Sequence, residues 1–414
     1  SDGAPMNEIL EDILIVGAVM VAGGVLALPR IANTKEWRAT ITPLASIIGS
    51  GFLILGPILD ASFGKWAPAA MAALCILGYA FGSAIRFNIR VLDGSQAKGG
   101  PHEKWTERAS SWALAFAYFV SVAYYLNLFG AFGVSLTEVD DRLHARLLTS
   151  AAFLVILFVG WFRGFGALER MEQISVSVKL SIILGLIVGL AIYFFKAAGG
   201  DELVFNAPSV TGVSAVTLLF GLIVTVQGFE TSRYLGEEYT AKIRIASMHW
   251  AQWISSGIYI IYILLMAYVF KRGELKLEET AIIGMMDIVA PILPALLVVA
   301  ALSAQFSAAV ADTSGSGGLL DELTKGKVNP KRGYAALVAV GIGFTWFTNV
   351  FEIINYASRA FAFYYALQSA LAAMRAHRTR AGIGLTALYG ALALLGALIV
   401  VFGKSAEGGS PPDG

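Results

Sequence analysis

Residues 44–57 read LASIIGSGFLILGP, an apolar run that Gly49-Ser50-Gly51 interrupts near its middle. Residues 226–238, VQGFETSRYLGEE, interrupt a second apolar run with Gly228 and the carboxylate of Glu230. Glycine weakens a helix in lipid, because it adds no side chain to pack and frees backbone that hydrocarbon cannot solvate. A carboxylate at membrane depth is costly and usually faces a cavity or a partner. Two interrupted segments at matching positions in two halves of a membrane protein predict a binding site at the bilayer midplane.

The composition is typical of an all-α polytopic membrane protein. Apolar residues make up 57% of the chain and charged residues 14%, so most of the surface must face lipid. A spanning helix needs about 20 apolar residues. We expect twelve spans; for the first of them, the alternative is a helix that lies on the membrane surface. The expected spans are Ile9–Leu28, Ile41–Phe63, Ala67–Phe87, Trp112–Leu136, Leu147–Phe165, Ile174–Phe195, Val213–Leu235, Met248–Phe270, Ile292–Thr313, Tyr334–Val350, Phe351–Met374 and Ile383–Phe402.

Basic residues predict the orientation of these spans. Twenty lysines and arginines fall in the expected loops on one side, and eight fall in the loops on the other side. The side with the larger number is expected to be cytoplasmic, because cytoplasmic loops carry the excess of positive charge. Both termini then lie outside, and we expect an integral, multi-pass protein of the plasma (inner) membrane.

The sequence argues against several other classes of function. A net charge of +1 does not favour a nucleic-acid partner. Cys75 is the one cysteine, so no internal disulfide is expected, and the four histidines show no metal-ligand spacing. The chain has no nucleophile–base constellation and no phosphate-binding glycine loop. We therefore expect neither an enzyme nor a bound cofactor, and the oligomeric state stays open.

Unwinding at the two interruptions would free backbone groups for binding. Free amides after Gly49-Ser50-Gly51, at the positive end of the following half-helix, suit a carboxylate. Free carbonyls around Gly228 suit an ammonium group. Two simpler interpretations stay open: the glycines form a small-residue packing face, and Glu230 pairs with Arg233 on one face of a helix.

The two interrupted runs resemble the first and sixth helices of the amino acid–polyamine–organocation (APC) permeases, which have the LeuT-type fold. The Gly-Ser-Gly tract of that family is matched by Gly49-Ser50-Gly51, and its sixth-helix pattern by Gly228-Phe229-Glu230 with Glu237-Glu238. Residues 166–170, GALER, are similar to the family's entry into helix 5. The order and five-helix spacing of these motifs carry the resemblance, and departures at both ends of the chain make it look like a divergent branch of the superfamily.

The resemblance implies a 5+5 inverted repeat, a ten-helix transport core over residues 41–376. Residues 1–40 would then comprise an N-terminal cloning remnant and one extra helix, and residues 377–414 the final helix and a polar tail. Family members usually lack the helix before the repeats and carry two helices after them, so this chain departs from the pattern at both ends.

Lys179 lies inside the expected span Ile174–Phe195, among small residues. Burial lowers the pKa of a lysine, which suits a proton carrier. The resemblance implies the same role, because proton-coupled APC members hold a helix 5 lysine where sodium-coupled relatives bind sodium. The alternative is a lysine that snorkels to the headgroups. If the coupling ion is sodium instead, Ser307 is the expected ligand on its helix, although serines commonly bond their own helix backbone.

These observations predict a secondary active transporter of an amino acid or related small organic amine, proton-coupled or an exchanger. The alternatives are a sodium-coupled symporter and an ion channel or inorganic-ion uptake protein on the same scaffold. Its expected partners are the small-molecule substrate and the lipid bilayer. The expected substrate-binding residues are Ile48, Gly49, Ser50, Gly51, Tyr124, Tyr125, Gln227, Gly228, Phe229, Glu230, Gln305 and Tyr356.

Overall fold

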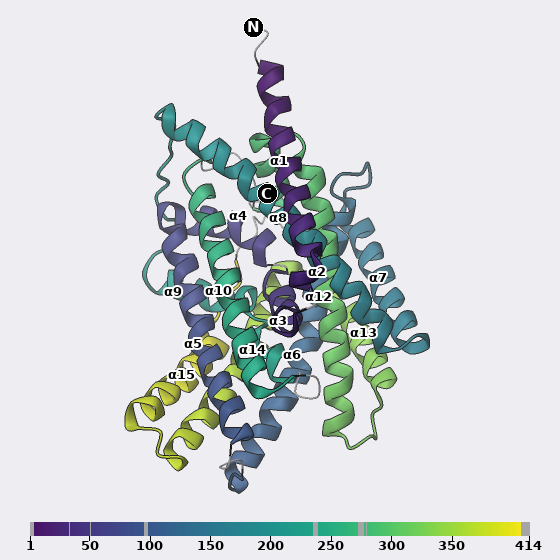
Figure 1. Ribbon diagram of the computed structural model, residues 1–414, viewed down its shortest axis with the longest axis vertical. Coiled ribbons are helices and arrows are strands. Elements are labelled where there is room, and N and C mark those ends of the chain that lie inside the picture. The colour runs from purple at the N-terminus through teal and green to yellow at the C-terminus, as the bar shows by residue number, and fades with distance from the viewer. Residues whose placement is uncertain are drawn as a thin grey trace.

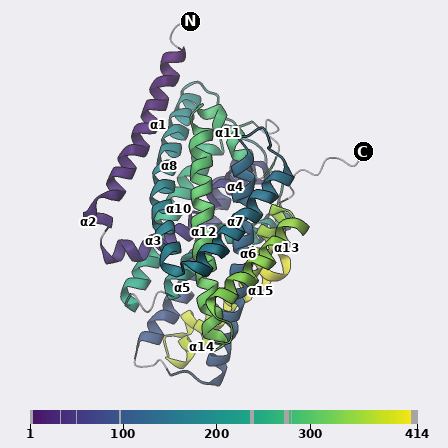
Figure 2. The ribbon, with the colours of Figure 1, turned by 90° about the vertical axis from the view of Figure 1, so that its right-hand side faces the viewer.

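The computed structural model describes residues 4–32, 34–49, 51–94, 98–234, 239–271, 277–278 and 280–406. These residues form helices, turns and loops, and none of them lies in a β-strand. The all-helical fold expected from the composition is therefore confirmed. Most of the long helices run along the long axis of the molecule (Figures 1 and 2).

Ten expected spans are continuous helices. Their bounds are α1 (Ala4–Ala27), α5 (Ala67–Asp93), α6 (Pro101–Val134), α7 (Arg142–Phe162), α8 (Phe165–Gly199), α10 (Ala241–Met266), α12 (Leu293–Leu323), α13 (Pro330–Phe347), α14 (Val350–Arg378) and α15 (Ile383–Phe402). Short helices α2 (Pro29–Ala32), η1 (Gly64–Trp66) and α11 (Ala281–Val289) connect them. Within the described residues, seven helical stretches are long and apolar enough to cross a membrane.

The two remaining expected spans are broken where the glycines occur. The first is divided into α3 (Lys35–Ile47) and α4 (Gly51–Phe63), which flank the break. The second is divided into α9 (Gly212–Gly221), a 3₁₀ turn η2 (Ile223–Val226) and a further 3₁₀ segment η3 (Phe229–Tyr234). Both interruptions predicted from the sequence are therefore present.

The glycines at these breaks allow the two broken segments to touch. A Cβ atom added at Gly51 would lie 2.3 Å from the carbonyl oxygen of Thr225, in η2. Gly228 has a φ of +120°, and an added Cβ would lie 2.6 Å from the Cβ of Ser46. Because both contacts are too close for any side chain, only glycine allows the segments to approach this closely.

Helix α1 lies at the edge of the molecule beside α8 (Figure 2). Ile15 of α1 is fully buried, and it packs against α8 where Gly185 and Gly189 leave room for it. Small residues spaced four apart let two helices approach closely in a membrane. Most of the other apolar side chains of α1 point away from the bundle, as expected for a helix that faces lipid.

The boundary between α13 and α14 is set by a capping box. The Asn349 side chain accepts a hydrogen bond from the Glu352 backbone amide at 3.0 Å, and the Glu352 carboxylate accepts one from the Asn349 amide at 3.2 Å. This reciprocal pair satisfies two amides that the start of a helix leaves unpaired. The adjoining segments expected at Val350 and Phe351 are therefore two separate helices.

Candidate functional site

The break after α3 leaves backbone carbonyls without their helical partners, and a lysine from another helix reaches one of them. A helix end cannot satisfy its last four carbonyls internally, and it carries partial negative charge. The Lys179 ammonium, on α8, donates to the Ala45 carbonyl at 2.6 Å, and its side chain is fully buried. Lys179 therefore does not snorkel to headgroups, and its charge lies beside the negative end of α3.

Tyr259 of α10 contacts both breaks. Its hydroxyl lies 2.7 Å from the Ile47 carbonyl and 3.2 Å from the Thr225 carbonyl, and the residue is fully buried. One phenol thus links the last residue of α3 to η2. The sequence alone does not indicate a role for this tyrosine, because nothing in its own helix distinguishes it from a core aromatic.

Ser358 of α14 bridges the gap between α9 and η2. Its hydroxyl donates to the Gly221 carbonyl at 2.8 Å and accepts from the Val224 amide at 3.1 Å. This side chain replaces the missing turn of backbone hydrogen bonding, as irregular backbone at membrane depth requires. Like Tyr259, Ser358 has no local sequence signal for this role.

Glu230 lies fully buried in η3 and is bound by groups other than Arg233. Its Oε2 accepts from the Gly228 amide at 2.9 Å and from the Tyr365 hydroxyl at 3.0 Å. Among the described residues, its Oε1 accepts no hydrogen bond. Arg233 instead donates to Gln368 at 2.6 Å. The alternative in which Glu230 pairs with Arg233 is therefore not what the structure shows.

Two helices bring polar groups to the same region. Gln227 donates from Nε2 to the Tyr125 hydroxyl of α6 at 2.5 Å, and its Oε1 has no partner in the described part of the chain. Ser121 of α6 donates to the Asp312 carboxylate of α12, and Tyr124 packs beside Tyr125. Tyr125 lies within electrostatic reach of both Asp312 and Glu230. The predicted residues Gln227, Glu230, Tyr124 and Tyr125 are thus drawn together.

Gln305 of α12 is buried on the helical stripe that also carries Ala308 and Asp312. Ala308 lies 3.5 Å from the position of a Cβ at Gly49, so this stripe faces the break after α3. Neither polar atom of the Gln305 side chain has a partner within the described residues. A buried amide with no partner is uncommon and requires an explanation.

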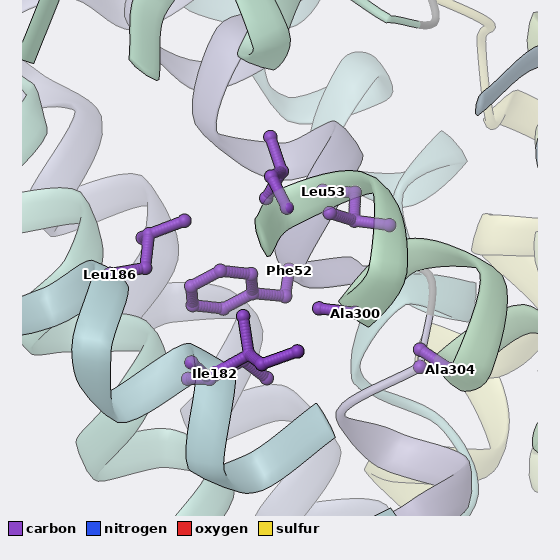
Figure 3. A pocket seen from close by; sticks show the side chains of 9 residues that line it. Phe52, Leu53, Ile182, Leu186, Ala300 and Ala304 are labelled. Atoms are coloured by element: carbon purple, nitrogen blue, oxygen red, sulfur yellow. The ribbon is translucent and has the colours of Figure 1, made fainter. Parts of the chain in front are cut away.

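A small apolar cavity lies beside the first break (Figure 3). Its volume is about 10 Å³, which has room for one water-sized molecule at most. Gly49 is the one predicted binding residue in its lining; the others are Phe52, Leu53, Ile182, Ile183, Leu186, Leu297, Ala300 and Ala304. The space against Gly51 is taken by Thr225 and Tyr259, so no side chain fits at this position.

The other predicted residues have different surroundings. Phe229 is fully buried and stacks on Tyr365, with the ring centroids 5.2 Å apart, and Ile48 is fully buried at the end of α3. Tyr356 is 44% exposed and packs against Phe344, so the structure does not bring it to this cluster. Ser50, Glu237 and Glu238 lie outside the described residues.

The described residues do not form a group of side chains that could hold a metal ion. Over the described ranges, no three His, Cys, Asp or Glu side chains come together. The Ser307 hydroxyl donates to the Ala304 carbonyl of its own helix at 3.0 Å, which is the common arrangement for a serine in a helix.

Replacing Tyr259 with phenylalanine is expected to destabilise the contact between the two breaks. The substitution removes a donor shared by two buried carbonyls, and an unsatisfied buried carbonyl costs about 1–3 kcal/mol. We expect a lower thermal midpoint of the purified protein. Tyr268→Phe is the control, because that hydroxyl donates at the exposed surface, to the Lys65 carbonyl at 3.1 Å. Equal midpoints for the two variants would contradict the role assigned to Tyr259.

Comparisons with known proteins show a family and a relative to which this chain is similar. The model of a family described as "APC superfamily transporter" matches residues 29–403. A protein of Aquifex aeolicus (strain VF5), whose name is "Uncharacterized protein", is 40% identical over 413 residues. The alignment covers 97% of this chain and 100% of that protein.

Proposed function

The chain belongs to the APC superfamily of transporters, and on that basis we propose that it is a secondary active transporter of an amino acid or related small organic amine. The proposal includes alternating access on a LeuT-type 5+5 inverted repeat in the cell membrane. It also includes coupling to protons, or exchange of one substrate molecule for another.

One observation carries this proposal: two broken helices contact each other at their breaks, and a buried ionisable side chain lies at each break. Lys179 donates to a carbonyl near the end of α3, and Glu230 lies in the first turn of η3. Ionisable residues inside a membrane protein are costly, so they usually mark a path for substrate or ions. Discontinuous helices supply free backbone groups at the same depth.

The helix ends and the buried polar atoms at the two breaks indicate how a substrate would bind. The first amides of α4, from Gly51 onward, lie at the positive end of a half-helix and suit a carboxylate. The Oε1 atoms of Glu230 and Gln227 are buried acceptors without partners among the described residues, and they suit an ammonium group. The cavity beside the first break is smaller than an amino acid, so we propose that these segments move apart when substrate binds.

For the coupling ion we propose the proton, carried by Lys179. Its ammonium lies against the carbonyl end of α3 and offsets the partial negative charge of that helix end, as a bound cation would. The alternative is sodium bound at Ser307, because a hydroxyl that donates its proton to its own helix keeps its oxygen lone pairs for a cation.

Uptake by the purified protein in proteoliposomes tests the proposal. A panel of radiolabelled amino acids and amines should be screened with and without a pH gradient, and with and without sodium. We expect saturable uptake of at least one compound, driven by an inward proton gradient or by internal substrate, without a need for sodium. Ionic currents without saturable uptake would favour a channel, and strictly sodium-dependent uptake would favour the symporter.

A further inference from the structure

Three basic residues gather where α5 and α10 reach the expected cytoplasmic boundary of the membrane. They are Arg86 and Arg90 of α5 and His249 of α10, and His249 lies within electrostatic reach of both arginines. Arg86 lies one residue before the end of the expected span Ala67–Phe87, and His249 directly follows Met248, where the expected span of α10 begins. The distribution of basic residues assigns this end to the cytoplasm. We call these three residues the basic cluster.

Arg86 is a buried charge whose partners are neutral. It is 4% exposed; its Nη1 donates to the Gln252 side-chain oxygen at 2.5 Å, and its Nη2 donates to the Tyr79 carbonyl at 3.3 Å. The guanidinium carbon also lies 4.5 Å from the centre of the Tyr79 ring. Arg86 takes part in none of the ion pairs among the described residues. A buried charge is costly unless an opposite charge compensates it, and the described part of the chain supplies none here.

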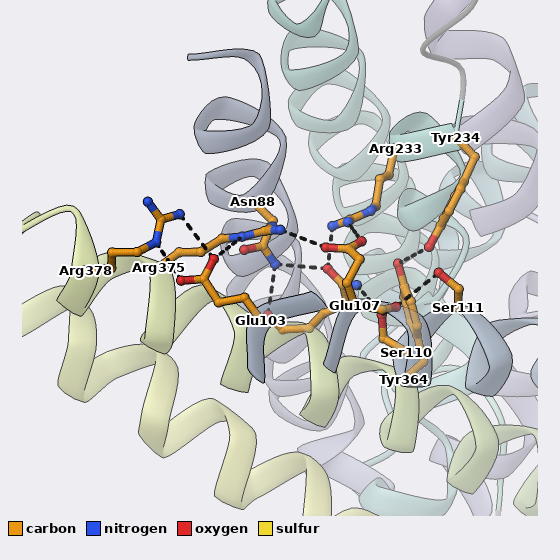
Figure 4. A network of polar contacts seen from close by, with 11 residues as sticks. Asn88, Glu103, Glu107, Ser110, Ser111, Arg233, Tyr234, Tyr364, Arg375 and Arg378 are labelled. Carbon is orange, nitrogen blue, oxygen red and sulfur yellow. Dashed lines mark hydrogen bonds and ion pairs between the residues drawn. The ribbon is translucent and has the colours of Figure 1, made fainter. Parts of the chain in front are cut away.

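Two other buried arginines show the usual arrangement. The side chains of Arg233 and Arg375 are each 5% exposed, and both pair with the Glu107 carboxylate (Figure 4). Arg86 is also held tightly, because Gly82 leaves it just enough room: a Cβ added at Gly82 would lie 2.9 Å from Nη1 of Arg86. The guanidinium of Arg86 is therefore fixed in place without a carboxylate.

The helices around the basic cluster carry an excess of positive charge. Asp93 is the one carboxylate in α5, α10 and α15, whereas the same helices contain four lysines and arginines: Arg86, Arg90, Lys242 and Arg244. Asp93 lies within electrostatic reach of Arg244. The groups with an electrostatic effect on Arg86 are Tyr79, Tyr389 of α15 and Arg90, and none of them is a carboxylate. The positive charge of the cluster is thus available to an anion.

An exposed apolar stripe of α10 begins beside the basic cluster. The ring of His249 contacts that of Trp253, and Trp253 contacts Trp250, with the ring centroids 5.8 Å apart in both pairs. The two tryptophans are 53% and 56% exposed, and Ile261 and Leu264 are exposed on the same side further along the helix. Tryptophans near the end of a span lie at the level of the lipid headgroups. This side of α10 therefore suits contact with a lipid.

We propose that the basic cluster binds the phosphate of an anionic phospholipid of the cytoplasmic leaflet, whose acyl chains lie along the Trp250 and Trp253 side of α10. Basic residues between spanning helices on the cytoplasmic side suit anionic headgroups. Arg90 is exposed and His249 is half-buried, so these two side chains contact the phosphate, while Arg86 adds its charge from behind them. A soluble phosphate would use the charges alone, whereas a lipid also uses the apolar stripe.

Lipid binding by the purified protein, measured by native mass spectrometry, tests this site. The protein in detergent is titrated with phosphatidylglycerol, which is anionic, or with phosphatidylcholine of the same acyl chains, which has no net charge. We expect the first phosphatidylglycerol to bind at least about fivefold more tightly than phosphatidylcholine, because each basic side chain near an anionic headgroup contributes about that factor. Equal affinities for the two lipids would overturn the proposed site.

Arg90→Gln and Arg86→Gln are each expected to weaken phosphatidylglycerol binding by about fivefold and to leave phosphatidylcholine binding unchanged. Arg332→Gln is the matched control, since this exposed arginine lies at the same end of the bundle, on α13, and donates to the Lys327 carbonyl at 3.3 Å. Arg90 is exposed, so Arg90→Gln alone decides the question if Arg86→Gln does not elute as a single peak in size-exclusion chromatography. Wild-type affinity for phosphatidylglycerol in Arg90→Gln would contradict the assignment.

Inorganic phosphate distinguishes the lipid from a soluble anion. Added in large excess, it is expected to leave the bound phosphatidylglycerol in place, because it cannot replace the contacts of the acyl chains. Displacement of the lipid by phosphate would overturn the proposed lipid and make a soluble phosphate compound the ligand. These measurements need no transported substrate, so their outcome does not depend on the proposed transport function.

Discussion

Lys179→Ala is expected to abolish the pH dependence of uptake. The ammonium group is fully buried, and it donates to a carbonyl that the break in α3 leaves without a helical partner. A hydrogen bond from a charged group is worth about 1.5–3 kcal/mol, which corresponds to roughly a ten- to hundredfold shift in a conformational equilibrium. Without it, α3 is no longer held to α8 in this conformation, and no proton can bind and leave at this position.

The experiment compares proton-driven uptake with exchange in proteoliposomes over a range of pH. We expect Lys179→Ala to lose net uptake at every pH while exchange of substrate for substrate persists. Lys196→Ala is the matched control, because this lysine lies on the same helix but is exposed and pairs with Glu11. Wild-type pH dependence in Lys179→Ala, together with a requirement for sodium, would transfer the coupling role to Ser307.

Gly51→Ala and Gly228→Ala are expected to remove both stability and uptake. A Cβ at Gly51 would lie 2.3 Å from a backbone oxygen of Thr225, which cannot move aside as a flexible side chain can. At Gly228 the added Cβ meets Ser46 at 2.6 Å, and the φ of +120° is strained for any other residue. Overpacking of a tight contact costs about 1–3 kcal/mol, and the backbone strain at Gly228 adds to it.

From the sequence alone, one would expect larger residues at these two glycines to block substrate and leave the fold intact. The contacts predict otherwise, because the neighbours of both glycines are the chain itself. Thermal unfolding and uptake should be measured with Gly257→Ala as the control, since a Cβ there meets no atom within 4 Å. That variant should match or exceed wild-type stability, as alanine is the better helix former. Wild-type midpoints for Gly51→Ala and Gly228→Ala would show that the two breaks do not touch as described.

The sequence by itself determined where the chain is helical and where its helices break. The last expected span, Ile383–Phe402, coincides with α15, and both glycine interruptions appear as breaks. These features depend on local properties: apolar length, the low helix propensity of glycine and the need to satisfy backbone groups in lipid. The charged residue inside a span, Lys179, was recognisable for the same reason.

Only the tertiary structure decided which groups meet. Glu230 and Arg233 are three residues apart and suggested a pair, yet Glu230 binds Tyr365 whereas Arg233 binds Glu107 and Gln368. Tyr356 is polar and aromatic like Tyr125, but it is 44% exposed and packs against Phe344. Tyr259 carries no local signal and still contacts both breaks, because its partners are carbonyls contributed by distant segments. Hydrogen-bond partners across a helical bundle are set by how the helices pack, and a periodic apolar sequence leaves many such packings open.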